Sequence, residues 1–411
     1  MKRPSLRGVL PSLGLAAVSV LLCLVLIEAA ARAAVHRRDS RVFTTRGSIV
    51  RFHPLLGWDK PPGAAGWLHR EEYDVYLEVN PHGLRGPDRP YAKPPGTHRT
   101  LLLGDSFAEG YTVAERDTVR AVLESRLDGR GCGRQEVLNG GTMGYSTDQE
   151  YLFYRSEGRR YQPDVVVVLF CSNDLYYNTT GEQGKPYFEL DGGRLVLRNS
   201  PVRPPGAGPW VRSPEARSLE TRAWRGSMAL RLLSDRTLQG NPRLHRLLAR
   251  VGLVEPQRRQ PVPPEMWPLF AGHREEVEEM WRRTESIFAA LRDEVQAGGG
   301  KLVVFYIPDR WEVDDRSWEL TLQTYEGARR GARRDKVVSR LREACLRAGI
   351  PLVDPREGLR AAEAGGQRTY FLQDYHWTAA GHRVAADQIA GLMDAQRLVG
   401  CPAAGTRSAQ R

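Results

Sequence analysis

Five short apolar segments place the strongest constraint on how this chain folds. They are TLLLG (100–104), EVLN (136–139), DVVVVLF (164–170), KLVVFYI (301–307) and IPLVD (350–354). Continuous apolar runs of this kind are typical of parallel strands buried on both faces. Helical patterns lie between or after them at 273–297, 334–348 and 378–394, the last with Thr378 as its N-cap. The alternation predicts an α/β domain with an open parallel sheet and helices on both faces.

The rest of the chain divides around this domain, which we place at 99–398. A β-rich lead-in (47–98) precedes it and contains an alternating strand at 73–80. An insertion (181–295) interrupts it with a hairpin at 185–199 and a basic helical stretch at 216–253, between Pro-rich linkers. The insertion is interpreted as a lid, a partner surface or a solvated decoration. A C-terminal tail (399–411) follows.

The N-terminus contains a long uncharged stretch. After a short tail (1–7), residues 8–27 contain no charged side chain and are long enough for a helix to cross about 30 Å of hydrocarbon. They predict a transmembrane anchor or an uncleaved signal, followed by a linker (28–46). Cleavage stays open, because AAARAA after the span resembles a cleavage region. The alternative is a buried helix of a soluble domain.

Charge and cysteine content exclude some classes of protein. The net charge is +11, but the arginines are scattered and no zinc-finger or RNA-recognition signature is present. We therefore expect no nucleic-acid partner, and some attraction to anionic envelope polymers or lipid. No CxxC pair exists, which argues against a structural zinc site. Cys132 and Cys401 lie in polar, loop-like contexts and are the pair that an oxidising compartment would allow to form a disulfide.

The segment RTLLLGDSFAEGY (99–111) places Ser106 where the first predicted strand ends. In open parallel sheets, ligands bind beyond the carboxyl ends of the strands. Ser106 is therefore either part of a turn or a nucleophile. A serine nucleophile needs a base, and the base needs a carboxylate that orients it.

The best candidates for base and carboxylate are in FLQDYHWTAAGH (371–382). Asp374 and His376 are two residues apart, so in an extended segment both side chains lie on one side. Asp374 would then hold the Nδ1–H of His376 and leave Nε2 for Ser106. The alternative is a helix N-terminus with an incidental Asp and His. His382 is a competing base, but it falls inside the predicted helix, and we interpret it as structural.

Acyl transfer also requires hydrogen-bond donors for the oxyanion of the tetrahedral intermediate. Two segments that follow strand ends contain such donors. VLNGGTMGYSTDQ (137–149) contains a glycine-rich turn, and VLFCSNDLYYN (168–178) contains the side-chain amide of Asn173. The alternatives are a tight turn and an Asx-type turn.

Taken in order, the GDS block, the glycine block, the ND block and the C-terminal Asp/His block resemble the SGNH (GDSL-like) hydrolase family, in its membrane-anchored bacterial type. The resemblance covers residues 99–178 and 301–394. It implies a flavodoxin-like three-layer α/β/α sandwich. It also implies that Ser106 is the nucleophile, that His376 is the general base, and that Asp374 orients it. The oxyanion hole would consist of the backbone N–H groups of Ser106 and Gly144 and the Asn173 amide.

Two blocks depart from the family pattern. The last family block often reads DxxH, whereas this chain has DYH, with Gln373 three residues before His376. Asp374 must then orient the histidine from a shorter spacing. The ND block is preceded by CS rather than by the commoner glycines, which changes the loop without removing the amide.

The resemblance implies acyl transfer through a serine ester, without a metal or an organic cofactor. The first hypothesis is an ester hydrolase for O-acyl esters of envelope carbohydrate or lipid-like substrates. The second is an O-acetyltransferase that modifies exopolysaccharide or cell wall. The third is a non-catalytic scaffold that binds polysaccharide. The resemblance also implies a membrane location with the active site outside the cytoplasm. No sequence feature indicates an oligomeric state.

Overall fold

The computed structural model forms two compact units, each described here by itself. The first combines the described parts of 1–42 and 206–258, and the second those of 43–205 and 259–411. The structure describes residues 6–39, 42–45, 49–70, 72–204, 227–230, 232–233, 237, 241–254, 260–270 and 272–399.

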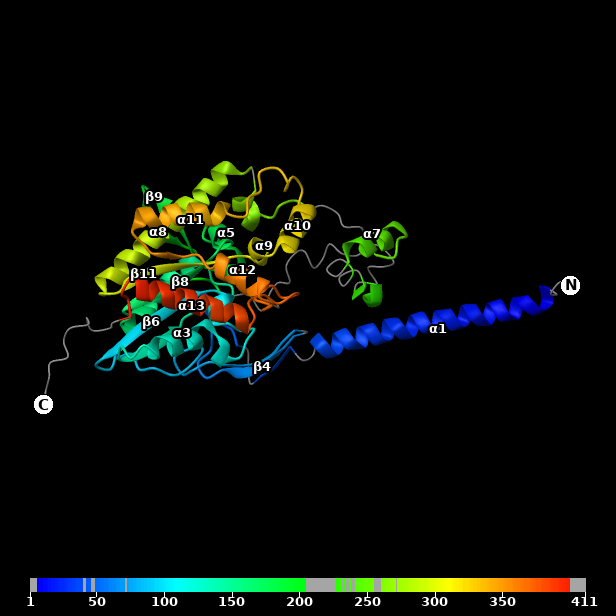
Figure 1. Cartoon of the computed structure of the whole chain (residues 1–411), viewed down its shortest axis with the longest axis horizontal. Coiled ribbons are helices and arrows are strands. Elements are labelled where there is room, and N and C mark those ends of the chain that lie inside the picture. Colours follow the sequence, from blue (N-terminus) through cyan, green and yellow to red (C-terminus); the bar gives the residue numbers. More distant parts are fainter. Residues whose placement is uncertain are drawn as a thin grey trace. The chain divides into compact units, whose positions relative to one another are not determined.

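A five-stranded parallel sheet forms the centre of the second unit (Figure 1). Its strand order is β12 (Leu352–Val353), β11 (Lys301–Ile307), β8 (Val165–Cys171), β6 (Thr97–Gly104) and β7 (Arg134–Asn139). Every neighbouring pair is parallel. Numbered along the chain from β6, this is the flavodoxin-like order 2-1-3-4-5, whose ligand crevice lies where the order reverses. Here that point lies between β6 and β8, and the prediction of a parallel α/β sheet is confirmed.

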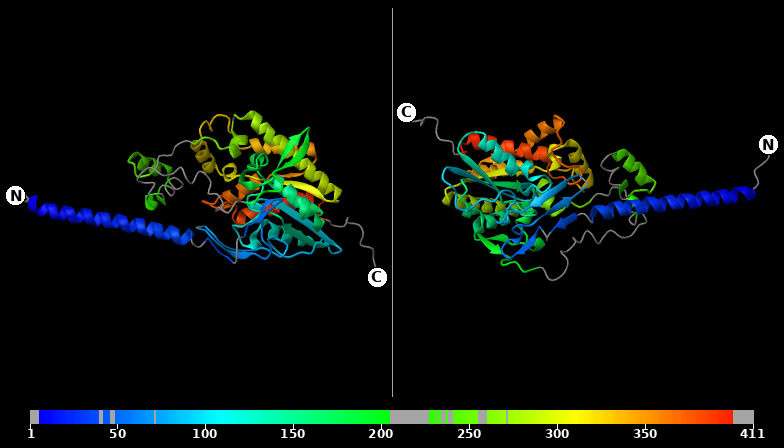
Figure 2. Two further views of the ribbon diagram at one scale, coloured as in Figure 1. Left: turned by 180° about the vertical axis from the view of Figure 1, so that it is seen from behind. Right: turned by 90° about the horizontal axis from the view of Figure 1, so that it is seen from below.

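Helices cover both faces of the sheet, which confirms the predicted three layers (Figures 1 and 2). Successive strand residues point to opposite faces, so Val166 and Val168 enter one core and Val165 and Val167 enter the other. The first core is closed by α4 (Thr147–Ser156), α8 (Arg274–Ala297) and α11 (Lys336–Ala348). The second is closed by α3 (Val119–Asp128), α12 (Arg356–Ala364) and α13 (Ala379–Ala395).

Short elements form the connections near the sheet. The short α-helices α2 (Ser106–Glu109), α5 (Asp174–Tyr177) and α9 (Arg310–Val313) have four residues each, and α10 (Asp315–Thr324) has ten. The 3-10 helices are η1 (Glu115–Asp117), η2 (Gly158–Tyr161), η3 (Glu182–Gly184) and η6 (Pro264–Leu269). Both α2 and α5 follow the carboxyl ends of central strands, so they begin at the edge where a ligand is expected.

The lead-in is β-rich, as predicted. It contains β2 (Arg51–His53) paired with β3 (Gly57–Asp59), and β4 (Ala65–His69) paired with β5 (Asp74–Glu78). Strand β1 (Val42–Thr45), which precedes the lead-in, pairs with β4 and completes a sheet of three strands with β4 and β5. The predicted alternation over 73–80 is seen in β5, where Val75 and Leu77 are buried and Tyr76 is exposed. The β4–β5 hairpin therefore has one face in a core and one in solvent.

The predicted insertion (181–295) is only partly separate from the sheet. The expected hairpin is present as β9 (Tyr187–Asp191) and β10 (Arg194–Arg198). Helix α8 packs on the sheet, with the rings of Phe170 and Phe288 5.4 Å apart. Because α8 connects β8 to β11 and has a long apolar stripe, it is a crossover helix of the sheet rather than part of an inserted element. Of the predicted insertion, only residues 206–258 belong to the first unit.

The first unit contains α1 (Leu6–Asp39) and α7 (Pro242–Arg250). The predicted span at 8–27 lies within α1. Among the residues that the structure describes, no helix is both long enough and apolar enough to cross a membrane. Of the predicted helical stretch at 216–253, residues 216–226, 231, 234–236 and 238–240 are outside the described residues. So is Cys401, the predicted partner of the disulfide-bonded Cys132.

Candidate active site

Ser106 lies at the carboxyl end of β6, as the first residue of α2. The carboxylate of Asp105 caps this helix by accepting the N–H of Phe107 at 2.8 Å. Gly104 has φ 154°, and a Cβ there would lie 2.7 Å from Cβ of Ala108, so only glycine permits the sharp turn from strand to helix. Burial raises the pKa of Asp105 to about 6. The turn thus places the Ser106 hydroxyl beyond the carboxyl end of β6, an inner strand of the sheet.

The structure brings together the three residues predicted as nucleophile, base and orienting carboxylate. Ser106 Oγ lies 2.8 Å from His376 Nε2, and His376 Nδ1 lies 2.5 Å from Asp374 Oδ1. Each distance is that of a hydrogen bond. If Nδ1 carries the proton, His376 donates to Asp374, and its Nε2 is free to accept the serine proton.

Asp374 reaches His376 across the short DYH spacing, but not through the extended segment that the sequence predicted. The segment is not extended, because Tyr375 between the two residues has φ 65°, a left-handed conformation that is rare outside glycine. The residues form a tight loop, closed by a hydrogen bond of 2.8 Å from Phe371 N–H to the His376 carbonyl. We call residues 371–377 the Asp-His loop. Helix α13 begins directly after it, with the Thr378 hydroxyl accepting the N–H of Ala380.

The surroundings of Asp374 keep its carboxylate ionised. Burial acts to raise its pKa, but hydrogen bonds from His376 and Tyr73 outweigh burial, and the pKa lies below its ordinary value. The imidazole of His376 contacts the rings of Phe107 and Tyr111, whose centroids are 4.6 Å and 5.0 Å away. A charged carboxylate and two ring contacts favour a single orientation of His376.

The position of His382 fits the structural role that the sequence analysis gave it. It lies in α13, is buried, and contacts the edge of the Trp377 ring at a centroid distance of 5.6 Å. Burial, with a smaller contribution from the charge of Arg85, lowers its pKa to about 3. In the described part of the chain, no hydrogen bond connects it to Ser106, so the geometry favours His376 as the base.

Among the described residues, no acceptor is hydrogen-bonded to the predicted oxyanion donors. In the described part of the chain, the backbone N–H groups of Ser106 and Gly144 make no hydrogen bond. The Asn173 side chain likewise lacks a partner among the described residues, although its Oδ1 is buried. Gly144 has φ 75° and lies beside the Trp58 ring. The roles of these groups in an oxyanion hole stay predictions.

The glycine loop (140–145) is fixed by side chains that the sequence analysis missed. Lys60 donates to the Gly141 carbonyl at 2.5 Å and to Thr142 Oγ1 at 2.6 Å. The Trp58 indole donates to the Met143 carbonyl at 2.9 Å, and the Glu109 carboxylate accepts the Met143 N–H at 2.6 Å. Lys60 and Trp58 come from the lead-in, where no sequence pattern indicates that they reach a loop some eighty residues later.

The Asp-His loop is also held by the lead-in. Glu72 accepts backbone N–H groups of this loop, and the hydroxyl of Tyr73 donates to Asp374 at 2.7 Å. These residues are about 300 positions away in sequence and have no motif of their own, so sequence reasoning missed them too. Both sides of the site therefore depend on the lead-in.

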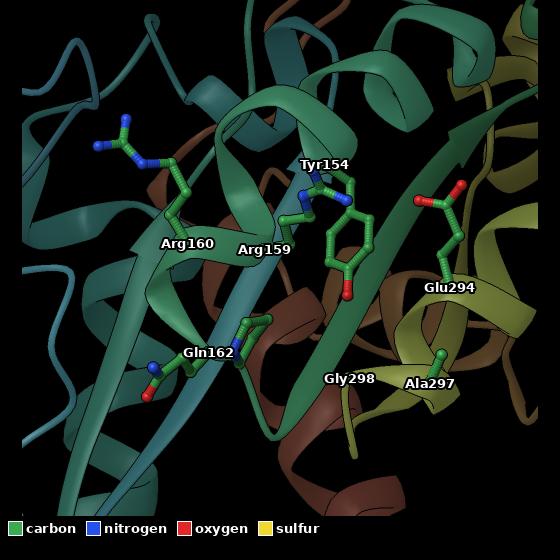
Figure 3. A pocket seen from close by; sticks show the side chains of 8 residues that line it. Tyr154, Arg159, Arg160, Gln162, Glu294, Ala297 and Gly298 are labelled. Carbon is green, nitrogen blue, oxygen red and sulfur yellow. The ribbon is translucent and has the colours of Figure 1, made fainter.

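A cavity of about 570 Å³ lies at the opposite edge of the sheet (Figure 3). Gln162 and Pro163, which line it, precede β8, and Ala297 and Gly298 precede β11. Since the strands are parallel, these residues lie at the amino ends of the strands, whereas Ser106 lies at the carboxyl ends. This cavity is therefore not the crevice of Ser106. Among the described residues, no cluster of three or more His, Cys, Asp or Glu side chains is arranged to hold a metal ion.

Comparisons with known proteins identify a family and several similar solved structures. The model of the GDSL-like lipase/acylhydrolase family matches residues 102–384. A lipase/acylhydrolase from Enterococcus faecalis is 10% identical, with 73% of this chain and 96% of that chain covered and a TM-score of 0.37. A catalytic mutant of an acetylxylan esterase from Geobacillus stearothermophilus is 10% identical, with 74% and 95% covered and a TM-score of 0.36. Another acetyl xylan esterase is 13% identical, with 72% and 98% covered and a TM-score of 0.37. No curated protein matches the chain.

Proposed function

This chain belongs to the GDSL-like lipase/acylhydrolase family, and from that membership we propose that it hydrolyses O-acyl esters through an acyl-serine intermediate on Ser106. One observation carries the proposal. Ser106 Oγ, the His376 ring and the Asp374 carboxylate form a continuous hydrogen-bonded series at 2.8 Å and 2.5 Å. A serine hydroxyl becomes a useful nucleophile in this arrangement, because a positioned base takes its proton as it attacks.

The first half-reaction forms the acyl-enzyme. Ser106 Oγ attacks the ester carbonyl carbon while its proton moves to His376 Nε2, and Asp374 stabilises the imidazolium. The N–H groups of Ser106 and Gly144 and the Asn173 amide donate to the oxyanion. The bond to the leaving oxygen then breaks, and His376 returns its proton to that oxygen. The products are a free alcohol and an acyl ester of Ser106.

The second half-reaction restores the enzyme. Water enters, gives a proton to His376 Nε2 and attacks the acyl carbonyl. The tetrahedral intermediate collapses, Ser106 Oγ regains the proton from His376, and the carboxylic acid leaves. Asp374 remains ionised throughout, consistent with hydrogen bonds that hold its pKa below the ordinary value.

The proposal extends to the kind of ester. Tyr375 and Leu372, both on the Asp-His loop, are 50% and 40% exposed. An exposed aromatic ring and an exposed apolar side chain on the loop that carries the histidine suit a sugar ring face or a lipid-like chain. We therefore propose O-acyl esters of envelope carbohydrate or of lipid-like alcohols as substrates. The location at a membrane, with the site outside the cytoplasm, stays a prediction.

A fluorophosphonate probe tests the chemistry directly, because it reacts covalently with an activated serine. We expect the full chain to be labelled at Ser106, as mapped by peptide mass spectrometry, and to hydrolyse p-nitrophenyl acetate. The Ser106→Ala variant should show neither reaction. Absence of labelling in the folded wild-type protein would contradict the proposal and favour the non-catalytic scaffold.

An acceptor experiment distinguishes hydrolysis from acyl transfer. Turnover of p-nitrophenyl acetate is measured with and without an oligosaccharide, while free acetate and acetylated sugar are both quantified. Hydrolysis predicts that acetate accounts for all the p-nitrophenol released in either case. Acetylated sugar that appears at the expense of acetate would assign the chain to the O-acetyltransferases instead.

A further inference from the structure

The tip of the β4–β5 hairpin contacts the Asp-His loop. Strands β4 and β5 are joined through residues 70–73, and Arg70 N–H donates to the Tyr73 carbonyl at 2.9 Å. Glu72 and Tyr73 lie at this tip, and both are half-buried. The family match begins at residue 102, so the hairpin is outside the part that the family model describes. Any role of the hairpin must therefore be argued from its own contacts.

Glu72 binds the backbone of the Asp-His loop. Its Oε1 accepts the N–H of Leu372 at 2.8 Å. Its Oε2 accepts the N–H of Gln373 at 2.7 Å and that of Asp374 at 3.1 Å. Three successive N–H groups that converge on one anion form a strong, charge-assisted contact. Glu72 thus fixes the backbone that carries the carboxylate of Asp374.

Tyr73 binds the side chain of the same aspartate. Its hydroxyl donates to Asp374 Oδ2 at 2.7 Å, whereas Oδ1 faces His376. The Tyr73 ring packs against Phe371, with centroids 5.0 Å apart. The hairpin therefore binds one oxygen of Asp374, and the imidazole binds the other, which also accepts the Tyr111 hydroxyl at 3.5 Å. A donor at Oδ2 draws negative charge away from Oδ1 and weakens its attraction for the imidazolium.

We propose that Glu72 and Tyr73 are positioning residues for the reaction, Glu72 by fixing the loop and Tyr73 by setting how strongly Asp374 attracts the imidazolium of His376. The inference rests on the proposed function, since it concerns the same serine chemistry. It assigns to the lead-in hairpin a part in the reaction that the family-matched domain does not supply by itself.

The pH profile of kcat/KM tests the role of Tyr73. In Tyr73→Phe, Asp374 loses a donor at Oδ2 and attracts the imidazolium more strongly, so His376 holds its proton to higher pH. We expect the acid limb of the profile for p-nitrophenyl acetate to move upward by about 0.5 pH unit. Other titratable or charged groups near this site are unchanged in the variant: Glu72, Arg70, Asp105, Glu109, Tyr111 and Arg310.

The sign of the shift separates this role from a merely structural one. If Tyr73 only kept Asp374 in place, its loss would misplace the carboxylate, and the acid limb would move downward or stay unchanged while the plateau fell. Tyr76→Phe is the matched control, because Tyr76 is on the same hairpin and exposed on its outer face. We expect its profile to match the wild type. An unchanged or downward limb in Tyr73→Phe would overturn the inference for Tyr73.

The role of Glu72 is tested by its amide variant. Glu72→Gln keeps the size of the side chain but removes its charge and replaces one accepting oxygen by an NH₂ group that faces backbone N–H groups, so the contact with the loop is weakened. We expect kcat and the rate of fluorophosphonate labelling to fall about tenfold, with KM little changed. Glu78→Gln on the exposed face of β5 should have no effect. An unchanged kcat in Glu72→Gln would overturn the inference for Glu72.

Failure of the inference and failure of the proposed function have different signatures. A wild-type protein that neither labels nor turns over ester contradicts the function. A wild-type protein that labels at Ser106, with Tyr73→Phe and Glu72→Gln variants indistinguishable from it, contradicts only the inference.

Discussion

The two loops beside Ser106 are both held by the lead-in, but in different ways. The glycine loop (140–145) is fixed by Trp58 and Lys60, which are only 7% and 4% exposed. The Asp-His loop (371–377) is fixed by Glu72 and Tyr73, which are half-buried at the tip of a hairpin. One loop is anchored from within the protein and the other from near its surface.

The difference corresponds to what each loop would do. Oxyanion donors must be in place before charge develops, which favours a rigid, buried support. A histidine that takes and returns a proton needs orientation and a tuned carboxylate, which a few directed hydrogen bonds supply. Substitutions around the glycine loop should therefore change mainly stability. Substitutions around the Asp-His loop should change mainly activity.

The largest effect is expected from the reacting groups themselves. Ser106→Ala and His376→Gln should each lower kcat for p-nitrophenyl acetate by at least about 10³-fold, because each removes a member of a unit that acts together. Melting temperatures should stay close to that of the wild type, since both side chains are only partly buried. If His376→Gln stays active while His382→Gln does not, His382 is the base and the comparison of the loops fails.

The next largest effect is expected at Asn173. Asn173→Ala should lower kcat by about 10²-fold by removing one oxyanion donor, as measured with saturating ester. Stability should change little, because in the described part of the chain this side chain has no partner to lose. Asn178→Ala is the control: Asn178 is buried and donates to Thr284 at 3.0 Å, so its loss should lower the melting temperature instead. Equal kcat values for the two variants would contradict the assignment of Asn173.

The sequence predicts the centre of the molecule better than its supports. The five apolar runs identify all five strands, because strands buried on both faces have a distinctive composition. Ser106, Asp374 and His376 could be proposed because each is in a block next to a predicted element. Lys60, Glu72 and Tyr73 could not, since one ordinary polar residue in a Pro- and Gly-rich segment does not indicate which distant backbone it will contact. The left-handed Tyr375 also has no sequence signal, because its φ is imposed by the loop closure around it.

A smaller effect is expected when the glycine loop loses its buried anchor. Lys60→Met removes hydrogen bonds to the Gly141 carbonyl and the Thr142 hydroxyl and leaves them without that partner. We expect a loss of about 1–3 kcal/mol in the free energy of unfolding, measured by urea denaturation. Lys93→Met is the control, because Lys93 is more exposed and pairs with Asp164 at 2.6 Å, a contact expected to contribute less than about 1 kcal/mol. If the two variants were equally stable, the glycine loop would not depend on its buried lysine.

The last effect depends on pH and concerns the C-terminal end of the Asp-His loop, where His382 packs against Trp377. Its pKa is about 3 in the folded protein against an ordinary 6.5, so between these values the unfolded chain binds a proton that the folded chain does not. Stability should therefore be complete above about pH 6.5 and fall as the pH decreases, by about 1.4 kcal/mol per pH unit for this one group. Asp105 and Asp309 act in the opposite sense, because burial raises the pKa of each to about 6 and stabilises the folded state at lower pH. The contribution of His382 must then be measured as a difference: from pH 6.5 to 4.5, urea unfolding of the wild type should lose stability more steeply than that of His382→Gln. Parallel curves would mean that His382 is charged in the folded protein. The Asp-His loop would then be held by solvated residues at His382 as well as at the hairpin tip.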